Sequence, residues 1–262
     1  MPAPQNAFKA AMKSGQPQMG CWVGLADAYT AEITASAGFD WLLIDCEHAP
    51  NDLRSMMAQL TVVEASGSKP VVRVPIGETW MIKQFLDAGA QTLLVPMVES
   101  KAQAEDLVSA VRYPPVGVRG VGSALARASH FSAISDYLTT ADSEICLLVQ
   151  VENRAGLVEL DAILSVEGVD GVFIGPSDLA ADMGHLGDPM HPEVVAVILD
   201  ALKRIKAAGK APGILTTNFD FARACLELGA TFVATSIDVT LYAAAIRGAA
   251  RQAKELLGSV EG

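Results

Sequence analysis

Eight short apolar runs alternate along the chain with longer segments of helical period. The runs cover residues 19–25, 41–47, 69–75, 92–98, 145–152, 171–177, 212–218 and 232–238. Most of the intervening segments end in glycine, as helices commonly do. Nearly continuous apolar strands that alternate with helices predict a parallel sheet covered by helices. At 262 residues, eight such units favour a closed (β/α)8 TIM barrel in one α/β domain.

The alternative architecture is an open, doubly wound sheet that binds a dinucleotide. That fold needs the pattern GxGxxG between its first strand and first helix, where this chain has GLADAYT. We therefore expect no nucleotide cofactor.

Two segments depart from the alternation of the single domain, residues 1–262. Residues 114–142 contain Gly117, Gly120 and Gly122, and we interpret them as a loop excursion near the mouth of the barrel. Residues 239–258 form a last predicted helix that is rich in small and apolar side chains. We expect this helix to pack on a neighbouring subunit.

Charge and cysteine usage narrow the classes of partner. The net charge is −11, from 19 basic and 30 acidic residues, and no basic tract is present, which argues against nucleic acid and anionic membranes. No apolar run is long enough to span a bilayer, and the first residues lack an apolar secretory core. The four cysteines show no CxxC spacing and are interpreted as reduced core residues. We expect a soluble, cytoplasmic protein that acts on small molecules.

Catalytic groups of such barrels lie at the carboxyl ends of the strands. A polar residue that ends an apolar run therefore counts for more than one on a helix. This criterion selects Asp45, Glu47, His48, Arg73, Gln150, Glu152 and Asp178, the last reached through Gly175, Pro176 and Ser177.

Glu152 and Asp178 follow neighbouring strands, and paired carboxylates bind hard divalent cations. The predicted ion is Mg²⁺, Mn²⁺ or Co²⁺. The alternatives are a helix cap for Asp178 and a solvated loop charge for Glu152. A protease-type zinc site is not expected because the chain lacks HExxH.

His48 and Arg73 also end strands. His48 suits a general base that titrates near neutral pH, or it is a structural histidine. Arg73 offers a fork of donors to a carboxylate or an enolate oxygen, or it forms an ion pair with Asp45 or Glu47. No lysine ends a strand, so a Schiff-base mechanism lacks its nucleophile. The other histidines are interpreted as surface or capping residues.

Several ordered motifs resemble those of the metal-dependent class II pyruvate aldolases, the HpcH/HpaI aldolase family. They are FDWLLIDCEHAPND, VVRVP, IKQFLDAGAQTLLVPMV, RYPPVGVRGVG, VQVEN and GVFIGPSDLA, and the resemblance runs from about residue 20 to residue 238. The family includes 4-hydroxy-2-oxoheptanedioate aldolase. Two departures are Cys46, where glycine is expected, and Val74, which separates Arg73 from a proline.

The resemblance implies reversible cleavage of 4-hydroxy-2-oxo acids to pyruvate and an aldehyde, through a pyruvate enolate stabilised by a divalent cation. It implies Glu152 and Asp178 as metal ligands, Arg73 as the partner of the enolate oxygen, and His48 with Asp87 as an acid–base dyad. Without the resemblance, the sequence pattern indicates that Asp87 is a solvated charge on a helix. The resemblance also implies Asp45 and Glu47 as supporting groups, and a homohexamer.

Substrate positions follow from the expected strand ends. The amides of Ser177 and Asp178, with Gln150, Gly175 and Pro176, are predicted to bind pyruvate. Trp22 and Leu215 are predicted to line the aldehyde end. Two other functions stay open: a citrate-lyase-like acyl-CoA lyase on the same barrel, and a ligand-binding barrel without catalysis.

Overall fold

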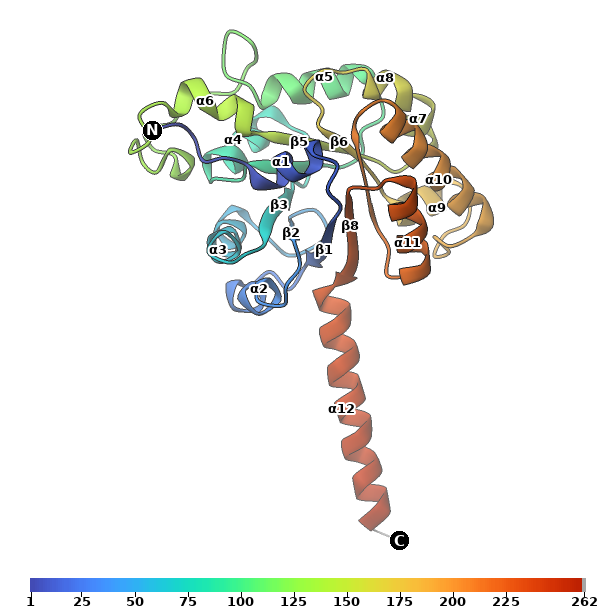
Figure 1. The fold of residues 1–262 in the computed structure, drawn as a ribbon. Helices are drawn as coiled ribbons and strands as arrows, with labels where there is room; N and C mark the ends of the chain where they lie inside the picture. Colours follow the sequence, from blue (N-terminus) through green and yellow to red (C-terminus); the bar gives the residue numbers. More distant parts are fainter. Residues whose placement is uncertain (261–262) are drawn as a thin grey trace.

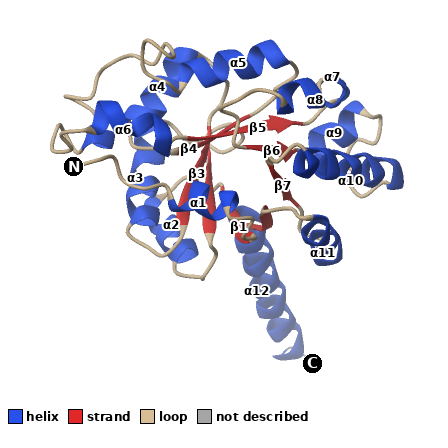
Figure 2. Ribbon diagram, turned by 45° about the horizontal axis from the view of Figure 1, so that its top comes forward, coloured by secondary structure: helices blue, strands red, loops and turns tan. Residues whose placement is uncertain are grey.

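The computed structural model describes residues 1–260 and contains a closed barrel of eight parallel strands in the order β1 to β8 (Figures 1 and 2). This confirms the predicted (β/α)8 barrel. The strands are β1 Gln18–Val23, β2 Trp41–Asp45, β3 Lys69–Arg73, β4 Thr92–Val95, β5 Cys146–Val151, β6 Gly171–Ile174, β7 Ala211–Leu215 and β8 Phe232–Ile237.

Helices surround the barrel in nearly every predicted place. They are α2 Ala28–Ala35, α3 Leu53–Glu64, α4 Thr79–Asp87, α5 Lys101–Ala110, α7 Arg154–Val158, α8 Leu160–Leu164, α9 Pro176–Asp182, α10 Pro192–Ala207, α11 Phe219–Leu228 and α12 Asp238–Val260. The alternation predicts one helix between the apolar runs 145–152 and 171–177, where the structure has the short pair α7 and α8. Helices α1 (Ala7–Lys13) and α6 (Tyr137–Glu144) were not predicted, since their segments are short and lie outside the repeating alternation.

The inside of the barrel is filled by aromatic rings. Trp22, Trp41, Phe173 and Phe232 lie in mutual contact, with centroids 5.4–6.5 Å apart. Gly213 makes room for this cluster, because a Cβ there would lie 2.1 Å from the Phe232 ring. The barrel is therefore a packed core rather than a pore, and only its ends are open to ligands.

The amino-terminal end of the barrel is closed by α1. Phe8 of α1 is 1% exposed and packs against Trp41 and Phe232 at 5.7 and 6.0 Å. Asn6 caps the helix and its side chain also donates to Thr92 Oγ1 at 2.9 Å. A small molecule can therefore reach the barrel interior only from the carboxyl ends of the strands.

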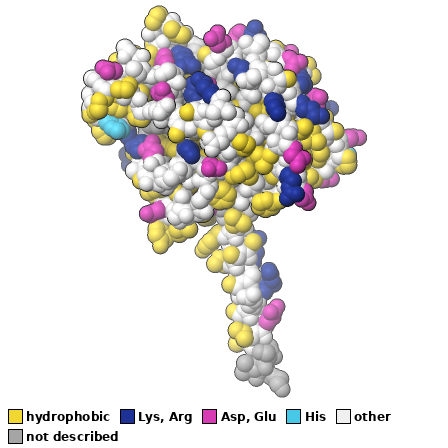
Figure 3. Space-filling view, viewed as in Figure 1, with side chains coloured by type: hydrophobic (Ala, Val, Ile, Leu, Met, Phe, Trp, Pro, Cys, Tyr) yellow, Lys and Arg dark blue, Asp and Glu magenta, His cyan; other side chains and the backbone are white. Residues whose placement is uncertain are grey.

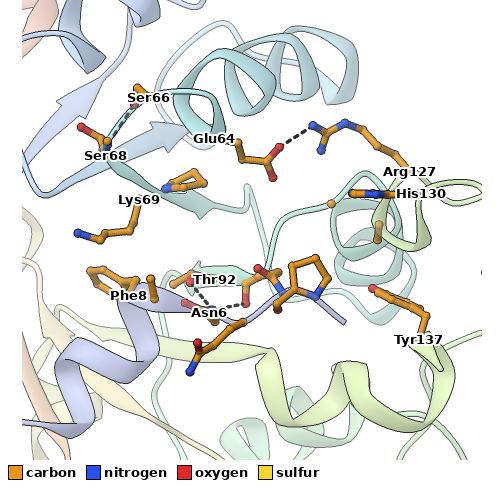
Figure 4. A pocket seen from close by; sticks show the side chains of 18 residues that line it. Asn6, Phe8, Glu64, Ser66, Ser68, Lys69, Thr92, Arg127, His130 and Tyr137 are labelled. Carbon is orange, nitrogen blue, oxygen red and sulfur yellow. Dashed lines mark hydrogen bonds and ion pairs between the residues drawn. The ribbon is translucent and has the colours of Figure 1, made fainter. Parts of the chain in front are cut away.

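The excursion, residues 114–142, is present but lies away from the mouth of its own barrel. Its 3-10 helix η1 (Arg127–Ser129) lies by the end of α4, with Arg127 bound to Glu64 at 2.6 Å. Arg127, His130 and Tyr137 face a pocket that also contains Asn6 and Lys69, at the amino ends of β3 and β4 (Figure 4). This differs from the expected position, because the excursion follows α5 after the chain has returned to the amino-terminal side.

Helix α12 leaves the body of the molecule after its first turns (Figures 1 and 3). It carries exposed apolar side chains along the projecting part, among them Leu241, Tyr242, Ile246 and Leu256. The prediction of a helix over 239–258 is confirmed in its backbone. Within residues 1–260, no helix is long and apolar enough to cross a membrane.

Candidate active site

A cavity of about 470 Å³ opens at the carboxyl ends of the strands. Most of the predicted site residues line it: Trp22, Asp45, His48, Arg73, Gln150, Glu152, Gly175, Pro176, Ser177, Asp178 and Leu215. Glu47 is not part of the lining but pairs with Arg73, which is, and Asp87 lines a different groove. Residues up to 193 positions apart in the sequence (Trp22 to Leu215) therefore line one cavity.

Asp45 and Arg73 are register partners on the adjacent strands β2 and β3. The guanidinium donates from Nε to Asp45 Oδ1 at 2.9 Å and from Nη2 to Oδ2 at 2.6 Å. Burial alone would raise the pKa of Asp45, but the hydrogen bonds and charge of Arg73 lower it below its ordinary value. Glu47 Oε2 lies 2.9 Å from Arg73 Nη1. The ion-pair alternative for Arg73 is thus observed, and Arg73 lines the cavity as well.

The carboxylate of Asp45 also orders the loop that follows β2. Its Oδ1 accepts the backbone N–H groups of Glu47 and His48 at 3.0 and 3.3 Å. On its other side, Trp22 Nε1 donates to Oδ2 at 3.3 Å. The Arg73 guanidinium lies over the Trp22 ring, 5.1 Å from its centroid, a favourable cation–π contact. Trp22 therefore supports the charged cluster while it lines the cavity.

Glu152 is a buried carboxylate at the end of β5. Its Oε1 accepts from the backbone N–H of Met97 at 2.9 Å, and its Oε2 accepts from Gln150 Nε2. Burial is the main cause that raises the pKa of Glu152 to about 7, and the nearby charges of Asp178 and Glu47 add to the shift. Glu152 is only 2% exposed, so it is not a solvated charge on a loop.

Asp178 is the third residue of α9 and does not cap it. The N-cap is Gly175, which has no side chain to offer. Gly175 also leaves space for Glu152, since a Cβ on it would lie 2.5 Å from Glu152 Oε2. The helix-cap alternative for Asp178 is therefore not what this structure shows.

The donor set fits a hard divalent cation. The charges of Asp178 and Glu47 both act to raise the pKa of Glu152, and the charge of Asp178 also acts to raise the pKa of Glu47. Gln150 Oε1 is buried and has no hydrogen-bond partner among the described residues. Buried oxygens without partners and repelling carboxylates are stabilised by a cation, and oxygen ligands favour Mg²⁺ or Mn²⁺.

His48 lies at the rim of the cavity. Its side chain is 66% exposed, and its Nε2 lies 3.9 Å from Glu47 Oε2. It is therefore not a buried structural histidine. Its imidazole is accessible both to water and to a molecule in the cavity.

Asp87 does not join His48 within one chain. It ends α4 and lines a separate groove with Met57 and Gly122. The fully buried Arg119 donates from Nη2 to Asp87 Oδ1 at 3.2 Å. An acid–base dyad of His48 and Asp87 would therefore need a second copy of the chain.

Other residues at the mouth were not predicted. Asp238, which follows β8, accepts the backbone N–H groups of Gly24 and Leu25 at 2.8 and 3.2 Å and so fixes the loop after β1. The strand-end criterion could have found it, because it ends an apolar run.

Cys46 packs in the layer between strands and helices and does not line the cavity. All four cysteines are free and buried, as predicted.

Fold and site together define a (β/α)8 barrel whose mouth carries buried carboxylates and a fixed arginine. The model of the HpcH/HpaI aldolase/citrate lyase family matches residues 18–245, and the chain belongs to this family.

Named relatives are similar over nearly their full length. A hydroxypyruvate/pyruvate aldolase of Roseovarius nubinhibens is 60% identical over 94% of this chain and 96% of its own. A 4-hydroxy-2-oxo-heptane-1,7-dioate aldolase of Salmonella dublin is 56% identical over 91% of each. The crystal structure of a family protein from Burkholderia cenocepacia J2315 superposes with a TM-score of 0.90 at 40% identity, over 95% of this chain and 100% of that one.

Proposed function

We propose that this protein is a class II pyruvate aldolase, a carbon–carbon lyase that reversibly cleaves 4-hydroxy-2-oxo acids to pyruvate and an aldehyde. The observation that carries the proposal is the mouth cavity, which gathers Glu152, Asp178, Arg73 and His48. The similar proteins named as aldolases support the same reaction class.

The cofactor in this proposal is one divalent cation, Mg²⁺, Mn²⁺ or Co²⁺, held by Glu152 and Asp178. When bound, it would polarise the keto group of pyruvate and so acidify the methyl protons. Gly175 keeps the Glu152 carboxylate at the cavity by leaving space for it.

Arg73 is proposed to stabilise the negative oxygen of the pyruvate enolate. Asp45 accepts hydrogen bonds from Nε and Nη2 of Arg73, and Glu47 Oε2 forms an ion pair with Nη1. Since the guanidinium carries five N–H groups, N–H groups remain free to face the cavity. A donor that is already fixed by Asp45 needs no reorganisation when charge develops on the substrate oxygen.

His48 is proposed to move the proton, directly or through water, between the substrate hydroxyl and the solvent. Its exposed position at the rim suits this role. The first-turn amides of Ser177 and Asp178 are proposed to bind the pyruvate carboxylate, because a helix start leaves N–H groups without backbone partners. Gln150, Gly175 and Pro176, which line the same cavity, are proposed to contact pyruvate as well.

The aldehyde is proposed to meet Trp22 and Leu215, which line the cavity. Apolar walls select by shape and discriminate weakly, by only about 1–3 kcal/mol for each methylene. The protein is therefore proposed to accept a range of aldehydes, in keeping with the two differently named groups of similar aldolases.

An acyl-CoA lyase is less well supported. Binding the phosphates of CoA would need basic side chains near the mouth, and the excursion has two arginines, Arg119 and Arg127. Arg119 is fully buried on Asp87, and Arg127 is paired with Glu64. Both charges already have partners away from the mouth cavity.

We also propose that the working form is a homo-oligomer, with six copies as the resemblance implies. The exposed apolar side chains of α12, including Tyr242 and Ile246, favour packing on a neighbour. A neighbour would also be needed to bring Asp87 to His48. A monomer of 27.5 kDa in light scattering at micromolar concentration would contradict this part.

The test of function is turnover with defined components. Chelated protein is incubated with pyruvate, a panel of aldehydes and single added metals, and the adducts are identified. Aldol adducts that require the metal support the proposal. Absence of adducts with every metal would leave a ligand-binding barrel as the better account, and adducts with the chelated protein would contradict metal dependence.

A further inference from the structure

Two histidines and a glutamate gather where α9 is joined to α10, outside the mouth cavity. His185, His191 and Glu193 each offer one ligand atom, and these atoms lie within 4.8 Å of one another. Among the side chains that the structure describes, this is the one group of three His, Cys, Asp or Glu residues gathered so closely. His185 and His191 were expected to be surface or capping residues, and His191 does cap α10.

We propose that His185, His191 and Glu193 form a second metal site, for a transition metal of the Zn²⁺ type, that ties the end of α9 to the start of α10. This site is independent of the proposed aldolase function and of the cation at the mouth.

The spacing of the ligand atoms is close to that of a metal site. His185 Nε2 lies 3.0 Å from Glu193 Oε2. Two ligands that are each about 2.0–2.1 Å from one tetrahedral Zn²⁺ are about 3.3 Å apart. The same pair of atoms can therefore bind one cation with little movement.

The third ligand, His191, has to turn its ring before it can bind the same cation. The rings of His185 and His191 are stacked, with centroids 3.5 Å apart and planes at 14°. The His191 Nδ1 accepts from the Glu193 N–H at 3.3 Å as the N-cap of α10, and metal binding has to offset this bond if the ring turns. His191 can therefore turn a ring nitrogen toward a cation held by the other two side chains.

The loop between the helices is already ordered around these residues. The His185 N–H donates to Ala180 O of α9 at 2.7 Å, and the His191 N–H donates to Asp188 O at 3.1 Å. Gly184 and Gly187 have positive φ values of 90° and 82°, a conformation that glycine adopts without strain. The ligands are thus presented by a preorganised turn, which lowers the entropic cost of binding.

Ligand chemistry separates this site from the mouth. Two imidazoles with one carboxylate suit zinc, cobalt, nickel or copper, whereas Mg²⁺ prefers oxygen alone. Glu193 is 71% exposed in its side chain, so water can complete the coordination sphere. An excess of Mg²⁺ should therefore fill the mouth and leave the histidine site for zinc.

The experiment titrates Zn²⁺ into the full-length, chelated protein in millimolar Mg²⁺, by calorimetry and by thermal unfolding. We expect one zinc per chain, and a rise in Tm with zinc. His185→Gln and His191→Asn should each lower zinc affinity at least about tenfold and abolish the rise in Tm. Asparagine is a good N-cap, so His191→Asn keeps α10 intact while it removes the imidazole.

Two control variants make the result specific. His130→Ala, which removes a histidine from the excursion, and Glu152→Gln, which alters the mouth, should both keep the zinc affinity. The proposal is overturned if no zinc binds in the presence of Mg²⁺, if both histidine variants bind zinc like the unaltered protein, or if Glu152→Gln alone abolishes binding. Aldolase turnover in Mg²⁺ should be the same for His185→Gln and the unaltered protein, so this test does not depend on the proposed function.

Discussion

Arg73 holds Asp45 through two parallel hydrogen bonds, of 2.9 and 2.6 Å, across the adjacent strands β3 and β2. Both residues are nearly buried, at 6% and 4% exposure. The Arg73 guanidinium lies over the Trp22 ring, and both residues line the mouth cavity. A planar fork in this position is fixed before any substrate arrives.

Replacing Arg73 by lysine keeps the charge but removes the fork. We expect turnover to fall roughly tenfold to thousandfold, because the enolate oxygen loses an oriented donor. Metal affinity should change little, since Arg73 is not a ligand. The checks are steady-state kinetics and metal titration, and near-normal exchange of the pyruvate methyl protons in this variant would assign Arg73 a purely structural role.

The Asp45–Arg73 pair also predicts a pH dependence of stability. The pKa of Asp45 is lowered in the folded protein, so its stabilisation is complete above the unfolded pKa of about 3.9 and is lost as the pH falls through the folded value. Asp45→Asn should therefore lower the free energy of unfolding near pH 7 by up to about 3 kcal/mol. Denaturant unfolding of both proteins should show this difference shrinking below about pH 3.9, and a difference that stays constant to pH 2.5 would contradict it.

Gly175→Ala tests the space reserved for Glu152. The new Cβ would lie 2.5 Å from Glu152 Oε2 and 2.7 Å from its Cβ, so the carboxylate must move. We expect weaker metal binding, lower turnover and a loss of stability of about 1–3 kcal/mol. Gly67→Ala is the matched control, because nothing lies within 4 Å of a Cβ at that position, and equal effects of the two changes would refute the steric argument.

Leu215→Ala tests the aldehyde end of the cavity. If Leu215 contacts the aldehyde, the preference among aldehydes and the product stereochemistry should shift, while pyruvate proton exchange stays near normal, since exchange does not involve the aldehyde. All three are measured on one preparation, together with Tm. An equal loss of all three with a lowered Tm would place Leu215 in the core.

Most of the mouth could be predicted from sequence, because its residues end apolar strands. Arg73 and Glu152 stand where strands stop, and a parallel barrel brings all such ends together. Asp178 does not end a strand directly. It was predicted because Gly175 and Pro176, which follow β6, lead into the short helix α9 that contains it. These signals are local, so a single sequence carries them.

Asp87 and the excursion show what local pattern cannot supply. Asp87 ends α4 and lines a groove outside the mouth cavity, and its partner Arg119 is 32 positions away in a segment without regular period. Nothing in the pattern of either segment indicates that they meet. Helix α1 was not predicted for a related reason. Phe8 is buried because α1 covers the amino-terminal end of the barrel, and the local sequence pattern carries no sign of that contact.

The most direct test of the account is the exchange of pyruvate methyl protons in D₂O, followed by NMR without any aldehyde. We expect exchange to need both the protein and an added divalent cation, to stop with a chelator, and to be lost in Glu152→Gln and Asp178→Asn, while borohydride traps no lysine adduct. Exchange that continues after complete metal removal, or a pyruvate-dependent lysine adduct, would contradict it.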